Sequence, residues 1–60
     1  MKTLRLTDNL TIDIIVVEPS IIRERDTLIY EVEENGGWWQ VYRTPEGTEI
    51  GFWTEDEEEV

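Results

Sequence analysis

Hydrophobic and polar side chains alternate along most of this chain, with the period of two that is typical of half-buried β-strands. In the first such stretch Leu4 and Leu6 fall on one face, while Thr3, Arg5 and Thr7 fall on the other. The second stretch ends in apolar residues on both faces, so we expect both of its sides to be covered there. The pattern predicts five short strands, over residues 2–7, 10–17, 27–33, 38–44 and 49–53.

Turn-forming residues separate these strands. Asp-Asn at 8–9, Asn-Gly-Gly at 35–37 and Pro-Glu-Gly at 45–47 each predict a tight turn. The turn at 35–37 has the strongest signal, because Asn and Gly accept the positive φ angles that two-residue hairpin loops require. Pro19 ends the second strand, and Ile21–Arg25 after it could be a strand, a loop or one helical turn capped by Ser20. We favour an extended loop.

The strands and turns together predict one small all-β domain over residues 1–54. An open sheet of this length would expose two edges and an apolar face, whereas a barrel buries one face of every strand. We therefore predict a five-stranded antiparallel barrel. Large side chains must supply its core, because a chain of 60 residues without cysteine or histidine has neither a disulfide nor a tight zinc site to stabilise it.

Acidic residues dominate the charge of the chain. Fifteen acids and five bases give a net charge of −10, and half of that excess lies in the last six residues, "EDEEEV". A run of like charges at a chain end repels itself and buries nothing, so we predict a disordered acidic tail over residues 55–60. The tail could serve solubility, or it could bind a basic partner.

The second half of the chain, "RDTLIYEVEENGGWWQVYRTPEGTEIGFW", resembles a Src-homology-3-like barrel of the bacterial type over about residues 26–54. The resemblance lies in an acidic residue before an alternating strand, a polar loop, a Gly-Trp-Trp strand, a short glycine turn and a Gly-aromatic closing strand. It implies an SH3-like barrel that offers Trp38, the first tryptophan of the pair, to ligands. The chain departs from the family after Trp53, where the usual proline and tyrosine are missing, and this argues against a proline-rich ligand.

Catalytic chemistry has little support in the sequence. The chain has no histidine and no cysteine, and its one lysine is Lys2. Glu31 and Glu33 could suggest an acid–base pair, but a solvated strand face is the simpler interpretation in so small a domain. The acidic tail lacks the spaced oxygens and the glycine of a calcium loop. We predict a protein that is not an enzyme and that uses no cofactor or metal.

A binding function has better support. If Val41 points into the barrel, alternation places Trp39 beside it and leaves Trp38, Gln40 and Tyr42 on the outer face. Aromatic side chains rimmed by carboxylates favour a basic or arginine-bearing protein or peptide, through cation–π contacts and ion pairs. The alternative for Trp38 is that it packs beneath the loops or the tail as part of the core. The predicted partner-binding residues are Glu31, Glu33, Glu34, Trp38, Gln40 and Tyr42.

Two other functions remain open. A small acidic protein can inhibit a nucleic-acid-binding protein by imitating phosphates, since carboxylates two residues apart on a strand repeat at about 6.6 Å, near twice the phosphate rise along DNA. The chain could also be a homo-oligomer that buries the face of Trp38 against itself. Direct binding to nucleic acid is disfavoured by the net charge of −10.

The expected location is the cytoplasm. The chain has no apolar run of the length that a secretion signal or a membrane span needs, and it has no cysteine. We expect a monomer or a weak homo-oligomer with no membrane partner.

Overall fold

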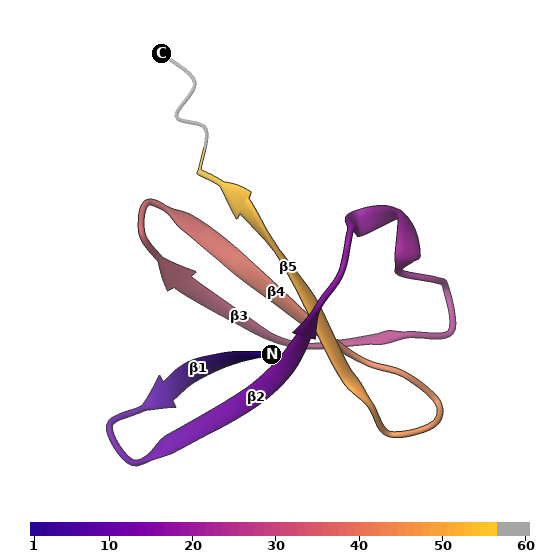
Figure 1. Cartoon of the computed structure of the whole chain (residues 1–60), viewed down its shortest axis with the longest axis horizontal. Coiled ribbons are helices and arrows are strands. Elements are labelled where there is room, and N and C mark those ends of the chain that lie inside the picture. The colour runs from indigo at the N-terminus through magenta and orange to yellow at the C-terminus, as the bar shows by residue number, and fades with distance from the viewer. Residues whose placement is uncertain (57–60) are drawn as a thin grey trace.

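The structure, a computed structural model, describes residues 1–56. This part of the chain forms five strands and one turn of 3-10 helix and contains no α-helix; Figure 1 shows their arrangement. The prediction of an all-β fold is therefore confirmed. The elements are β1 (Lys2–Thr7), β2 (Leu10–Val16), η1 (Pro19–Ile21), β3 (Thr27–Glu34), β4 (Gly37–Arg43) and β5 (Glu49–Glu55).

The strands form one sheet in the order β1-β2-β5-β4-β3. The pairs β1/β2, β3/β4 and β4/β5 are antiparallel, but β2 and β5 run parallel, with Ile15 opposite Ile50 and Val16 opposite Gly51. The prediction of a wholly antiparallel barrel is thus wrong at the centre of the sheet. The connection that contains η1 carries the chain from β2 to the far edge at β3, and the two hairpin turns that follow bring β5 back alongside β2 in the same direction.

The sheet is strongly curled, but within residues 1–56 it does not close. β1 and β3 are its two edges, and no backbone pairing joins them in this part of the chain. The hairpin of β1 and β2 and the hairpin of β3 and β4 diverge from the point where β2 meets β5 (Figure 1). The fold is therefore a half-barrel rather than the closed barrel we predicted, because the two hairpins are joined by only two residue pairs of β2 and β5.

The hairpin turn between β3 and β4 has the geometry that its sequence predicts. Asn35 and Gly36 have φ angles of 53° and 80°, and the residues that flank them, Glu34 and Gly37, face each other in the ladder. Two central residues with positive φ define the type I′ turn, whose twist matches that of the adjoining strands. The turn at 45–47 is also confirmed, with Gly47 at φ 87° and its N–H bonded to the Thr44 carbonyl oxygen at 2.9 Å.

The connection after β2 begins as a helical turn, so our preference for an extended loop over Ile21–Arg25 is wrong at its start. Pro19 occupies the first turn of η1, where its fixed φ suits a helix and its missing N–H is not needed. The N–H of Ile21 donates to the Glu18 carbonyl oxygen at 2.9 Å. Glu18, and not the predicted Ser20, stands at the N-cap position, and it makes no side-chain capping bond.

The core lies between the two hairpins. Leu4 from β1, Ile14 from β2 and Val41 from β4 are fully buried. β3 contains a bulge between Leu28 and Tyr30, and the bulge turns Ile29 toward this cluster. Strict alternation along β3 would have pointed Ile29 away from the core. The half-buried side chains of Ile12, Ile29, Val32 and Trp39 complete the packing.

The apolar end of β2 is less covered than we expected from its sequence. Ile15 and Val16 are 50% and 53% exposed, although both pair with β5. The curled sheet has no second layer over this end among the described residues, so the two side chains remain at the surface.

The predicted acidic tail begins later than we expected, because Glu55 ends β5 and the Asp56 N–H donates to the Gly36 carbonyl oxygen at 3.1 Å. Residues 57–60 of that tail lie outside the described residues.

Replacing Gly37 with alanine should destabilise the protein by about 3 kcal/mol, the upper end of what overpacking costs. The new Cβ would overlap the carbonyl oxygen of Thr54 and the indole ring of Trp53, and a backbone oxygen in a strand cannot easily move. Gly36→Ala is the matched control. It has open space for a Cβ, but its φ of 80° should cost about 1–2 kcal/mol. Urea unfolding followed by tryptophan fluorescence measures both, and a Gly36→Ala variant that loses as much as Gly37→Ala would contradict the crowding at Gly37.

Candidate functional site

The side chains predicted to bind a partner project mainly from one side of the sheet formed by β3, β4 and β5. Val41 points into the core, so alternation directs Trp38, Gln40 and Tyr42 of β4 to the opposite side, which we call the outer face. Residues that face each other across a ladder share a side of the sheet. The ladders therefore add to the outer face Glu31 and Glu33 from β3, and Phe52 and Thr54 from β5.

A shallow hollow of about 290 Å³ lies at one end of this face. It brings together three of the predicted residues, Glu31, Trp38 and Gln40. Three further lining residues, Thr54, Glu55 and Asp56, escaped the sequence analysis because we ended the last strand at residue 53 and assigned residues 55–56 to a tail. The alternation of Phe52 with Thr54 was the available signal that β5 continues along the whole length of β4.

The two aromatic residues of the predicted platform play different roles. Trp38 lines the hollow and is 36% exposed, so part of its surface is accessible to another molecule. Tyr42 lies further along β4, where its ring stacks on Phe52 with centroids 6.2 Å apart. Its hydroxyl donates a long hydrogen bond of 3.5 Å to Gln40 Oε1. Tyr42 thus borders the platform, whereas Trp38 forms its accessible surface.

Acidic groups surround Trp38. Glu33 faces it directly across the β3/β4 ladder, and Glu31, Glu55 and Asp56 line the hollow with it. All four acids are exposed, and none of them forms an ion pair within residues 1–56. Several unpaired carboxylates around one hollow make the electrostatic potential there negative, and a negative potential attracts cations.

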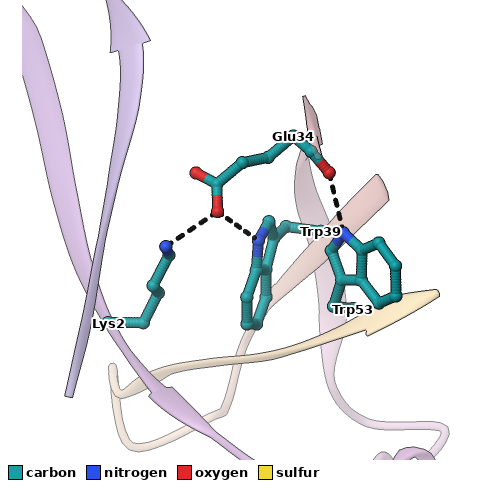
Figure 2. A network of polar contacts seen from close by, with 4 residues as sticks. All are labelled: Lys2, Glu34, Trp39 and Trp53. Atoms are coloured by element: carbon teal, nitrogen blue, oxygen red, sulfur yellow. Dashed lines mark hydrogen bonds and ion pairs between the residues drawn. The ribbon is translucent and has the colours of Figure 1, made fainter. Parts of the chain in front are cut away.

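Glu34, the sixth predicted residue, points to the other side of the sheet. Figure 2 shows its carboxylate between two basic or N–H donors: Lys2 Nζ lies 2.7 Å from Oε1, and Trp39 Nε1 donates to the same oxygen at 3.2 Å. The backbone carbonyl oxygen of Glu34 accepts a 2.9 Å hydrogen bond from Trp53 Nε1. Lys2 Nζ also lies 5.6 Å from the centroid of the Trp39 ring. Glu34 is therefore held within the molecule and does not border the hollow.

This cluster of Lys2, Glu34, Trp39 and Trp53 joins the two edges of the sheet, because Lys2 belongs to β1 and Glu34 to β3. Side chains thus connect strands that have no backbone pairing with each other in the described residues. The salt bridge and hydrogen bond from Lys2, together with the hydrogen bond from Trp39, lower the pKa of Glu34, and desolvation opposes them only in part. Trp39 thus lies on the inner side with Val41, as alternation along the strand predicts.

Comparison with known proteins identifies no relative, since no family model, no curated protein and no solved structure matches the chain. Within residues 1–56 no helix is long and apolar enough to cross a membrane. The same residues contain no group of three acidic side chains arranged to hold a metal ion.

The contribution of the Lys2–Glu34 pair to stability should depend on pH. Folding lowers the pKa of Glu34, so the unfolded chain binds the extra proton more readily and the stabilisation is lost on acidification. It should be fully present above the ordinary carboxyl range near about 4.3 and should disappear as the pH falls through the lowered value. The measurement is the difference in urea midpoint between the wild type and Lys2→Met at pH 7 and at pH 3.

The control for this prediction is the double-mutant cycle with Glu34→Gln, which separates the pair from the other acids that titrate in the same range. A coupling between Lys2 and Glu34 that is equally large at pH 3 and pH 7 would show that the charge of Glu34 contributes nothing to it.

Proposed function

We propose that this chain is a non-catalytic protein-binding module that holds a basic side chain of its partner at Trp38 on the outer face. The observation that carries the proposal is the comparison of two acid–indole pairs in one hairpin. On the inner side, Glu34 and Trp39 hold Lys2, with 2.7 Å to the carboxylate and 5.6 Å to the ring centroid. On the outer side, Glu33 stands opposite Trp38, and within residues 1–56 it has no ion-pair partner.

The inner pair indicates which group the outer pair suits. An ammonium or guanidinium group gains an ion pair with the carboxylate and a cation–π contact with the indole, the latter about 0.5–1 kcal/mol at an exposed site. Each contribution is modest, so a stable complex requires several of them together. The additional acids Glu31, Glu55 and Asp56 supply further contacts around the same hollow. A partner with more than one basic side chain fits this arrangement best.

We further propose that the fold is of the Src-homology-3-like type and that the protein acts in the cytoplasm. The strongly curled five-stranded sheet supports the first proposal, as does the type I′ turn that directly precedes the Trp-Trp strand. The absence of cysteine from the sequence is compatible with the second.

Trp38→Ala should abolish capture of the partner from a lysate, or weaken it at least about tenfold, which corresponds to the roughly 1.4 kcal/mol or more that a central aromatic contributes to binding. Leu10→Ala is a matched control, because Leu10 is 51% exposed but lies at the start of β2, away from the hollow. Immobilised wild-type and variant proteins are compared by quantitative mass spectrometry at rising salt. Equal capture by Trp38→Ala, with elution at low salt, would replace the proposed function with phosphate mimicry.

Neutralising the acids beside Trp38 should weaken the same complex, whereas neutralising distant acids should not. Glu31→Gln/Glu33→Gln changes the site, and Glu24→Gln/Glu46→Gln removes the same charge from exposed positions in two loops. We expect about a tenfold or larger loss of affinity for the first variant and less than about twofold for the second. Equal losses would mean that net charge, and not the acids of the outer face, determines binding.

A further inference from the structure

The free edge of β3 adjoins the proposed binding site. Within residues 1–56, β3 pairs with β4 alone, and with eight residues it is the longest strand of the described sheet. The backbone N–H and C=O groups on its other side have no strand partner in this part of the chain. An edge of this kind is a template to which an extended peptide can add by main-chain hydrogen bonds. Its regular part runs from Tyr30 to Glu34, after the bulge.

Side chains of two different kinds project from the two sides of this edge. Glu31 and Glu33 lie on the outer face, are exposed, and stand beside Trp38 and Gln40 of β4. Tyr30, 38% exposed, lies on the inner side with Val41, and Glu34 on that side is already paired with Lys2, so the unpaired acids of the edge lie on the outer side. Residues of an added strand would lie about 4.5–5.5 Å from those they face.

Charge determines which strand can occupy the edge. β3 contains three acids and no base. Two copies of β3 placed side by side would set glutamates against glutamates, which is unfavourable for directly opposed pairs. The acids therefore protect the edge against a second copy of the same strand and favour a basic one.

We infer that the partner binds through an extended segment in which basic and apolar residues alternate, added as a strand to the edge of β3. Its basic side chains pair with Glu31 and Glu33 and reach Trp38, and its apolar side chains cover Tyr30. The inference rests on the function proposed above and specifies the conformation and residue pattern of the partner.

Peptides test the inference directly. The probe is an acetylated, amidated octapeptide in which lysine alternates with valine, titrated calorimetrically into the full chain at about 150 mM salt. Two further peptides carry N-methyl groups on alternate residues, one set on the odd and one on the even positions. Both keep every charge, but in an added strand only one of them loses the N–H groups that face β3.

We expect one methylated peptide to bind at least about tenfold more weakly than the other, because it alone loses several edge hydrogen bonds. Tyr30→Ser should weaken the unmodified peptide, whereas Leu28→Ser, on a residue 44% exposed but beyond the bulge, should not. Equal affinity of the two methylated peptides would overturn the added strand. So would a failure of all three peptides to bind, or a wild-type dimer in sedimentation that the unmodified peptide does not dissociate.

Failure of this inference and failure of the proposed function give different results. If both methylated peptides bind equally well and both are lost with Trp38→Ala, the platform stands and only the strand geometry is wrong. If the peptides bind Trp38→Ala and Glu31→Gln/Glu33→Gln as well as they bind the wild type, both the added strand and the proposed function are wrong.

Discussion

One carboxylate, that of Glu34, connects the two edges of the open sheet. Glu34 is the last residue of β3. Its carboxylate forms an ion pair with Lys2 of β1 and accepts a hydrogen bond from the indole N–H of Trp39, and its backbone carbonyl oxygen accepts one from the indole N–H of Trp53. In a closed barrel, backbone hydrogen bonds between the first and last strands of the sheet would connect the two edges. Here the contacts of Lys2 with Glu34 and with the Trp39 ring connect the two edges instead. Among residues 1–56 the fully buried side chains are those of Leu4, Ile14 and Val41, so a polar connection across the opening contributes where apolar burial is scarce.

The adjacent tryptophans illustrate how a single strand serves two purposes. Alternation forces Trp38 and Trp39 to opposite sides of β4, and each ring then meets an acid of β3. The inner acid–indole pair is completed by Lys2 from the same chain, whereas the outer pair faces solvent. The type I′ turn at Asn35 and Gly36 sets the register that makes both meetings possible. A shift of this register by one residue would exchange the two rings.

Much of this arrangement could be predicted from local patterns. Alternation and turn residues placed the five strands within two residues of their observed ends, and Val41 correctly indicated which side of β4 is buried. The parallel contact of β2 with β5 could not be read in this way, since it joins segments that have no local signal for each other. The bulge at Ile29 could not be predicted, because the residues of β3 before and after it alternate between apolar and polar in the usual way. Glu34 was misplaced beside Trp38 for a related reason, because its partner Lys2 lies 32 residues away in the sequence.

The parallel contact between β2 and β5 also has a kinetic consequence. The two antiparallel hairpins join neighbouring segments and can form early, but Ile15 must meet Ile50 across 35 residues of chain. Such long-range closure is slow, because the loop entropy is lost before the contact stabilises anything. During synthesis the ribosome releases both hairpins before β5 is available to hold them together. The edge of β2 that pairs with β5 thus remains unprotected until β5 reaches it, and an unpaired strand edge of this kind promotes aggregation.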